Sequence, residues 1–100
     1  MQTYPLHDAE NRLFAFEVSN LTLGRRGLCR IVETIPGASL VRRPKAFSWL
    51  REDSFCECLV DGELFEAEEP FGDNSRYWVG PHPPRWIAQT ERVHDAFQRW

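Results

Sequence analysis

Apolar and polar residues alternate through several short segments of the chain, which is the pattern of β-strands with one buried face. Residues 12–18 form the first such segment, with three apolar side chains on one side: Phe14, Phe16 and Val18. Residues 1–10 precede this strand, and we interpret them as a lead-in to the domain. Residues 39–43 are predicted to form a short strand that Pro44 ends, since proline cannot continue a hydrogen-bond ladder.

A β-hairpin is predicted around Asp61-Gly62, because this pair favours the type I′ turn between two strands. The strands would cover 54–60 and 63–69, and a two-residue loop fixes their register by counting. The expected pairs are Val60 with Glu63, Leu59 with Leu64, Cys58 with Phe65, Glu57 with Glu66, Cys56 with Ala67 and Phe55 with Glu68.

The next strand is predicted over 75–79, after a turn cluster at 70–74. If Ser75 pairs with Glu69, Tyr77 and Val79 join the apolar side of the hairpin. On the other side, Arg76 would face Glu68 and Trp78 would face Glu66. The alternation agrees across the three strands, which supports this register.

Two helices are predicted. The first follows three candidate N-caps, Ser19, Asn20 and Thr22, and ends at Pro36-Gly37. Gly24 and Gly27 weaken its first turn, so a start near Gly27 is the alternative. Its apolar residues at helical spacing are Leu21, Leu28, Ile31, Val32 and Ile35. A stiff Pro-rich linker over 81–84 leads to the second, whose stripe consists of Trp86, Thr90, Val93, Phe97 and Trp100. Residues 45–52 fit a helical turn and an irregular strand equally well.

The predicted fold class is α+β: a two-layer sandwich in which two helices cover one face of a mostly antiparallel sheet of four or five strands. The order of elements is β-α-β-β-β-β-α. A chain of 100 residues has room for a single domain, here 1–100. No apolar run approaches the ~20 residues of a transmembrane helix, and the N-terminus lacks the pattern of a signal peptide.

Charge is segregated along the chain. Residues 1–50 hold seven basic and four acidic groups, whereas residues 51–100 hold five basic and eleven acidic groups. The two segments either neutralise each other in the fold or form two opposed patches, one of them for a partner.

Three cysteines are an odd and sparse set for a secreted domain, so free thiols in a reducing cytoplasm are expected. Cys56 and Cys58 lie two apart in a strand, where the separation is at the upper limit for a disulfide. We expect no bond between these two.

The face of the predicted sheet away from the helices is the candidate binding surface. It would carry five polar or aromatic residues: Glu57, Glu66, Glu68, Arg76 and Trp78. A tryptophan and an arginine inside a polar rim are typical of interface hot spots. The alternative is a solvated sheet face with a partly covered tryptophan.

Catalytic and metal sites have little support in the residue spacing. The carboxylates of the open sheet face lack the cleft that an acid/base pair needs, and the cysteines and histidines lack the spacing of a zinc site or a nucleophile–base set. We expect no catalytic residue, no metal and no cofactor.

A basic segment is the alternative site, for nucleic acid. Its residues are Arg25, Arg26, Arg30, Arg42 and Arg43, and helix N-termini and arginines both bind phosphate. Residues 23–40 resemble the GxxG-helix-strand segment of KH domains, which implies nucleic-acid binding, but the helix that precedes that loop in the family has no room here.

The sequence therefore predicts a small, cytoplasmic, non-catalytic protein-binding domain: a regulator, inhibitor or immunity-type protein that acts by occupying a surface. Nucleic-acid binding is the first alternative, and an enzyme with its site at an oligomer interface is the second. Another protein is the expected partner, a homodimer is an open alternative, and no membrane is involved.

Overall fold

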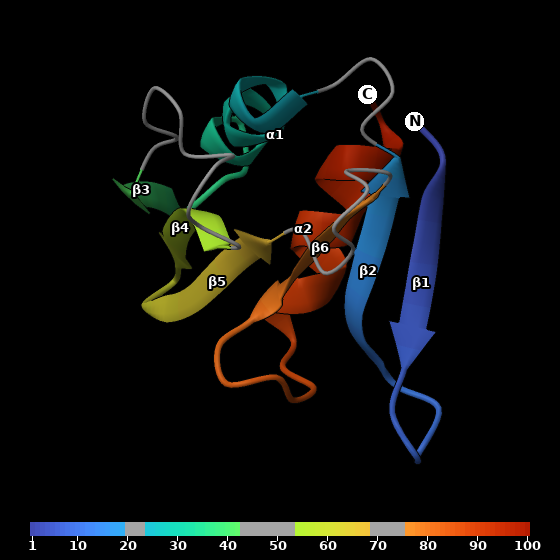
Figure 1. The fold of residues 1–100 in the computed structure, drawn as a ribbon. Helices are drawn as coiled ribbons and strands as arrows, with labels where there is room; N and C mark the ends of the chain where they lie inside the picture. The colour runs from blue at the N-terminus through green and yellow to red at the C-terminus, as the bar shows by residue number, and fades with distance from the viewer. Residues whose placement is uncertain (20–23, 43–53, 69–75) are drawn as a thin grey trace.

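The computed structural model describes residues 1–19, 24–42, 54–68 and 76–100 (Figure 1). The ambiguous segment 45–52 lies outside these residues. The elements are β1 (Thr3–His7), β2 (Leu13–Ser19), α1 (Gly24–Glu33), β3 (Ala38–Arg42), β4 (Ser54–Val60), β5 (Glu63–Glu68), β6 (Arg76–Pro81) and α2 (Gln89–Gln98).

The described strands form one six-stranded sheet in the order β1-β2-β6-β5-β4-β3, and all neighbours are antiparallel. Both helices contribute to the same buried core as the inward side chains of the sheet. The predicted α+β sandwich with two helices on one face is therefore confirmed, whereas the strand count is higher than the expected four or five.

The additional strand is β1, which lies in the segment interpreted as a lead-in. That interpretation is wrong for residues 3–7, which pair with β2 from Thr3 opposite Val18 to His7 opposite Leu13. Pro5 is tolerated here because β1 is an edge strand, where a missing N–H need not interrupt a ladder. The corrected order of elements is β-β-α-β-β-β-β-α.

The β4–β5 hairpin has the register predicted from its turn. Asp61 and Gly62 both have positive φ, 51° and 81°, as a type I′ turn requires. The five pairs from Val60–Glu63 to Cys56–Ala67 are confirmed. The sixth is wrong, because an irregularity in β4 places Ser54, and not Phe55, opposite Glu68.

The β5–β6 pair is shifted by two residues from the prediction. Ala67 lies opposite Val79, and Glu68 lies opposite Trp78. Tyr77 and Val79 are buried as predicted, because a shift by two preserves the face on which each side chain points. Strand β6 also continues to Pro81, so this residue belongs to the sheet and not to the linker.

Among the residues that the structure describes, the two helices bury the stripes that their spacing predicts, except at the ends of the second one. Leu21, at the start of the first predicted stripe, lies outside these residues. In α1 the buried residues are Leu28, Cys29, Ile31 and Val32. In α2, Thr90, Val93 and Phe97 are buried. Helix α2 begins only at Gln89, so Trp86 precedes it, and both Trp86 and Trp100 remain exposed, by 37% and 60%.

His94 connects α2 to the first strand. Its Nε2 lies 2.7 Å from the hydroxyl of Thr3, and its ring packs at 4.9 Å from the ring of Phe16. Burial lowers the pKa of His94 below its usual 6.5, and the neighbouring His7 adds to this against the opposing effect of Asp95. Neutral His94 is therefore part of the packing that holds β1 and β2 to the helix layer.

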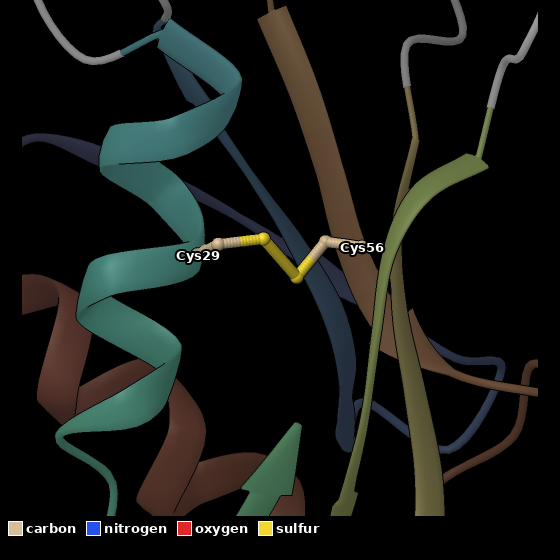
Figure 2. The surroundings of a disulfide bond; sticks show 2 residues. All are labelled: Cys29 and Cys56. Carbon is tan, nitrogen blue, oxygen red and sulfur yellow. A yellow bond between two sulfur atoms is a disulfide. The ribbon is translucent and has the colours of Figure 1, made fainter. Parts of the chain in front are cut away.

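A disulfide joins Cys29 of α1 to Cys56 of β4, with their Cα atoms 6.4 Å apart (Figure 2). The expectation of three free thiols is therefore wrong, because packing α1 on the sheet brings together two cysteines 27 residues apart. The expected absence of a Cys56–Cys58 bond is confirmed. Cys58 is free and buried, and burial raises the pKa of its thiol to about 11.

Candidate protein-binding surface

The outer face of the sheet is the face opposite α1 and α2, and no described helix covers it (Figure 1). Strand alternation determines which residues lie on it. Phe16 and Val79 point into the core. Their chain neighbours Glu17 and Trp78 therefore point outward, and they lie directly opposite each other on β2 and β6.

All five residues of the predicted surface occupy outward positions of the sheet. Glu57 lies opposite Glu66 on the β4–β5 hairpin, as predicted. The two contacts predicted with β6 are wrong, since Trp78 faces Glu68 instead of Glu66. The same two-residue shift moves Arg76 beyond Glu68, toward the end of β5. The alternation pattern alone cannot reveal such a shift, because a register that slips by two residues keeps every side chain on the same face.

Arg76 is held against two residues of the N-terminal hairpin. The carbon at the centre of its guanidinium lies 3.7 Å from the centroid of the Tyr4 ring, within the range of a cation–π contact. Its Nη1 donates a hydrogen bond to Oε1 of Glu17 at 3.2 Å. The Arg76 side chain is 40% exposed, whereas the Glu17 side chain is only 12% exposed, so the arginine partly covers its carboxylate partner.

Sequence reasoning missed both partners of Arg76. Tyr4 belongs to the segment interpreted as a lead-in, and Glu17 is not among the residues of the predicted surface. The signal that identifies them is the outward phase of both strands, once β1 is paired with β2. Tyr4 lies directly opposite Glu17 in that pairing.

These pairings place four residues in one row across the outer face: Tyr4, Glu17, Trp78 and Glu68. Aromatic rings and carboxylates alternate along this row, which crosses β1, β2, β6 and β5 in turn. Side chains of directly opposed residues are about 4.5–5.5 Å apart at Cβ. Each carboxylate of the row is therefore adjacent to an aromatic ring.

One edge of the Trp78 ring lies over Gly80, two residues further along the same strand. A Cβ added at Gly80 would lie 2.7 Å from Cη2 and 2.9 Å from Cζ2 of the Trp78 ring, and 2.9 Å from Cβ of Ala15. The absence of a side chain at Gly80 therefore lets the indole rest on the backbone. Ala15 is fully buried although it faces outward, which is consistent with this cover. The ring itself is half-buried, so its position is fixed while part of it stays accessible.

Glu66 and His82 form the far end of the outer face. The Nδ1 of His82 lies 3.2 Å from Oε1 of Glu66, and the backbone N–H of His82 donates to the carbonyl of Leu64 at 2.9 Å. The first part of the predicted linker is therefore tied to β5. Glu66 is adjacent to Glu57, so the positive form of His82 would offset a like-charge pair.

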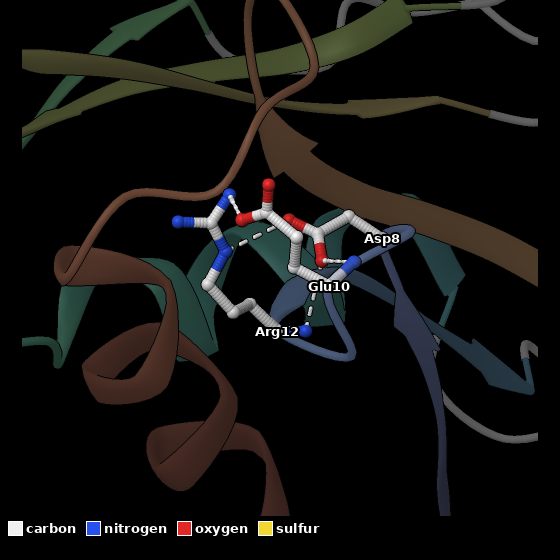
Figure 3. Close-up of polar contacts among 3 residues, drawn as sticks. All are labelled: Asp8, Glu10 and Arg12. Carbon is white, nitrogen blue, oxygen red and sulfur yellow. Dashed lines mark hydrogen bonds and ion pairs between the residues drawn. The ribbon is translucent and has the colours of Figure 1, made fainter.

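The β1–β2 turn holds a second polar cluster (Figure 3). Oδ1 of Asp8 accepts hydrogen bonds from the backbone N–H groups of Glu10 and Arg12, each at 2.9 Å. The bond from the Arg12 backbone is the main cause that lowers the pKa of the Asp8 carboxyl below its usual 3.8. The Arg12 guanidinium pairs with Asp8 and Glu10 and lies 5.0 Å from the ring of Trp86. This cluster fixes the turn by interactions among its own residues.

Three residues of the predicted basic surface lie on α1. Arg26 and Arg30 are exposed on α1, one helical turn apart, and Arg25 is partly buried. Arg42 ends β3 opposite Glu57, and Arg43 lies outside the described residues. Arg26 and Arg30 therefore share one exposed face of α1, whereas Arg42 belongs to the sheet.

Two acidic residues of the segment 51–100 pair with arginines of that same segment. Arg92 pairs with Asp61 at 2.7 Å, and Arg85 pairs with Glu63 at 2.7 Å. In the described part of the chain, no group of three or more His, Cys, Asp and Glu residues is arranged to hold a metal ion. The same residues include no helix long and apolar enough to cross a membrane.

Comparison of the chain with protein-family models, with curated proteins and with solved structures gives no match. The chemistry of the surface is therefore interpreted from its own residues.

Proposed function

We propose that this protein is a small binding domain that regulates or inhibits another protein by occupying its surface through the outer face of the sheet. The observation that supports this proposal is the arrangement around Arg76, which is stacked on Tyr4 and bonded to Glu17. Arg76 lies next to Trp78 on a face that no described helix covers. Tryptophan, tyrosine and arginine are the residue types that dominate binding energy at protein interfaces.

Preorganisation strengthens the case. Ordering a long side chain at an interface costs about 0.5–1.5 kcal/mol, and Arg76 already has two partners that fix it. Trp78 is likewise held by the contact of its ring with Gly80. Both side chains therefore reach a partner with part of their conformational entropy already lost in folding. Carboxylates around them supply the polar rim that excludes water from a hot spot.

Affinity capture from nuclease-treated lysate of the native host tests the proposal. Three baits are compared: the wild type, the outer-face variant Arg76→Ala/Trp78→Ala, and the helix variant Arg26→Ala/Arg30→Ala as a matched control. Circular dichroism and thermal melting first establish that each bait is folded. We expect one stoichiometric protein on the wild type and on the helix variant.

The outer-face variant should lose that protein, since truncating a hot-spot residue costs ~2 kcal/mol or more, about 30-fold in affinity. Undiminished capture by a folded outer-face variant would show that the surface is elsewhere. Capture of the chain by itself, with the same dependence on Arg76 and Trp78, would identify the partner as a second copy.

Nucleic-acid binding is the second candidate, favoured by the exposed pair Arg26 and Arg30 on one face of α1. It predicts an affinity for labelled RNA or DNA that falls steeply with salt concentration and that the helix variant loses. Absence of binding at low salt excludes it.

The proposed cytoplasmic location stays a prediction. It was supported by the expectation of three free thiols, but Cys29 and Cys56 form a disulfide. Disulfides persist mainly in oxidising compartments, so this bond argues against the cytoplasm. Alkylation of thiols in intact host cells, followed by mass spectrometry, determines which form exists in the cell. A modified Cys29 supports the cytoplasm, and a protected one contradicts it.

A further inference from the structure

We propose that His94 is a positioning residue of the outer-face site and makes this site sensitive to pH. The outer-face site comprises Tyr4, Glu17, Arg76 and Trp78. Neutral His94 holds β1 so that Tyr4 stays beneath Arg76, and protonated His94 loosens that hold. The inference rests on the proposed function, because the arrangement that it regulates is the proposed binding surface.

Strand β1 connects the helix layer to the outer face through two successive residues. The hydroxyl of Thr3 lies 2.7 Å from Nε2 of His94 on α2, so Thr3 points toward the helix layer. Tyr4 points outward, and the centroid of its ring lies 3.7 Å from the central carbon of the Arg76 guanidinium. Successive side chains of a strand point to opposite faces, so a contact that fixes Thr3 also fixes the direction of Tyr4.

The position of β1 depends on such side-chain contacts because β1 is an edge strand of the described sheet. Its hydrogen-bonded neighbour in that sheet is β2, on one side. Pro5 follows Tyr4, and a proline restricts the residue before it to extended backbone conformations. A movement of Thr3 is therefore transmitted to Tyr4 and is not absorbed by the backbone between them.

The surroundings of His94 favour its neutral form. The residue is 8% exposed, and its ring packs 4.9 Å from the ring of Phe16. Among the described residues its hydrogen-bond partner is the hydroxyl of Thr3, which carries no charge to balance an imidazolium. A buried charge without a counter-charge is costly, and burial accordingly lowers the pKa of His94 below its usual 6.5. The protonated ring therefore favours a position closer to water, away from Thr3.

Charged groups on the packed elements act on the ring in both directions. His7 of β1 opposes the positive form of His94, whereas Asp95 of α2 favours it, and burial has the larger effect. Strand β2 presents an uncharged ring. The ammonium group of Met1 donates hydrogen bonds to backbone carbonyls in the last turn of α2. This second attachment keeps the start of β1 in place, so protonation of His94 displaces Tyr4 without detaching the strand.

The Nε–H resonance of Arg76 in a ¹⁵N spectrum tests the inference, because an aromatic ring beneath the guanidinium shifts it. Arg76→Lys identifies the resonance by its absence, and Tyr4→Leu gives its position without the ring. The resonance is followed from about pH 8 to about pH 5, the range in which histidine changes its charge. A dispersed amide spectrum at each pH establishes that the chain remains folded.

In the wild type, the Arg76 resonance should move toward its position in Tyr4→Leu as pH falls below 6.5. His94→Gln keeps a hydrogen-bonding group near Thr3 but does not titrate, so its resonance should respond less. All other titrating groups are the same in the two proteins, and the difference between their profiles therefore belongs to residue 94. His7→Gln should raise the midpoint of the profile, because it removes a group that opposes protonation of His94.

Thr3→Val tests the same coupling at neutral pH, without any titration. It removes the hydroxyl that bonds His94 and should move the Arg76 resonance toward its position in Tyr4→Leu. Thr90→Val is the matched control. Thr90 is a buried threonine of α2 whose hydroxyl has no hydrogen-bond partner among the described residues, so its replacement should leave the resonance in place.

Identical pH profiles for the wild type and His94→Gln would overturn the inference, and so would an Arg76 resonance that Thr3→Val leaves in place. Affinity capture at about pH 8 and about pH 5 separates this failure from that of the proposed function. Capture that depends on Arg76 and Trp78 but is equal for the wild type and His94→Gln at both pH values removes the regulation and leaves the surface. A resonance that follows His94, together with capture that does not depend on Arg76, removes the surface and with it the regulatory role.

Discussion

Reduction of the Cys29–Cys56 disulfide should destabilise the protein by about 3.5 kcal/mol. The bond closes a loop with a sequence separation of 27. In the chain-entropy description, the unfolded chain loses about 12 cal/mol/K when a loop of this length is closed, or about 3.5 kcal/mol at 25 °C. A domain of this size has a free energy of unfolding of roughly 5–15 kcal/mol, so the bond contributes a large share of it.

Urea titration followed by tryptophan fluorescence, with and without a phosphine reductant, measures this contribution. With a slope of about 1.5 kcal/mol/M, the unfolding midpoint should fall by roughly 2 M on reduction. Cys29→Ala/Cys56→Ala should melt near the reduced wild type and be insensitive to the reductant. Cys58→Ala is the matched control and should keep the full effect of the reductant, because Cys58 forms no disulfide.

The count of free thiols gives an independent check. After denaturation without reductant, only Cys58 should react with an alkylating agent, and after reduction all three cysteines should react. Three reactive thiols before reduction, together with equal midpoints in the two titrations, would refute both the bond and the calculation built on it.

Three further predictions concern packing and titration. Gly80→Ala should lower the free energy of unfolding by ~1–3 kcal/mol, the range for overpacking, because the new methyl group meets the Trp78 ring; an unchanged urea midpoint would show that the indole is not seated there. Burial lowers the pKa of His94, so the folded protein binds fewer protons than the unfolded chain just below pH 6.5. The stabilisation from neutral His94 is then complete above that pH and is lost as pH falls through the folded pKa, and a His94→Phe variant should lack this slope in pH-dependent melts. The carboxyl of Asp8 should titrate below its usual pKa of 3.8 in a ¹³C NMR titration. Arg12→Ala should raise that pKa only part of the way, since the backbone N–H of residue 12 remains; full recovery would assign the shift to the guanidinium instead.

Local sequence signals predicted the strand register where a short turn fixes it. Asp61-Gly62 fixed the β4–β5 register because a two-residue loop leaves no freedom in the count. The β6 register was predicted two residues off because the alternation pattern cannot distinguish two registers that differ by two residues. The buried face of β6 was nevertheless right, since a period-two pattern is unchanged by an even shift.

The alternation of apolar and polar residues does not predict contacts between segments that are distant in sequence. The Cys29–Cys56 bond depends on how α1 packs across β4. The spacing of the cysteines in the sequence does not predict this packing. Likewise, the outward positions of all five predicted surface residues followed from strand phase. Tyr4 and Glu17 join them only through the pairing of β1 with β2 and of β2 with β6, which brings Arg76 to Glu17 across 59 residues of sequence.

The pairing of β2 with β6 also determines at which stage of synthesis the outer face can form. Tyr4 and Glu17 are synthesised early, whereas Arg76 and Trp78 follow only after α1, β3, β4 and β5. At about 5–20 residues per second, the N-terminal hairpin waits for several seconds before the strand that completes its sheet emerges. The N-terminal hairpin contains Tyr4 but not Arg76, and β6 contains Arg76 but not Tyr4. The surface is therefore absent from a nascent chain and exists only once the sheet has closed around its last strand.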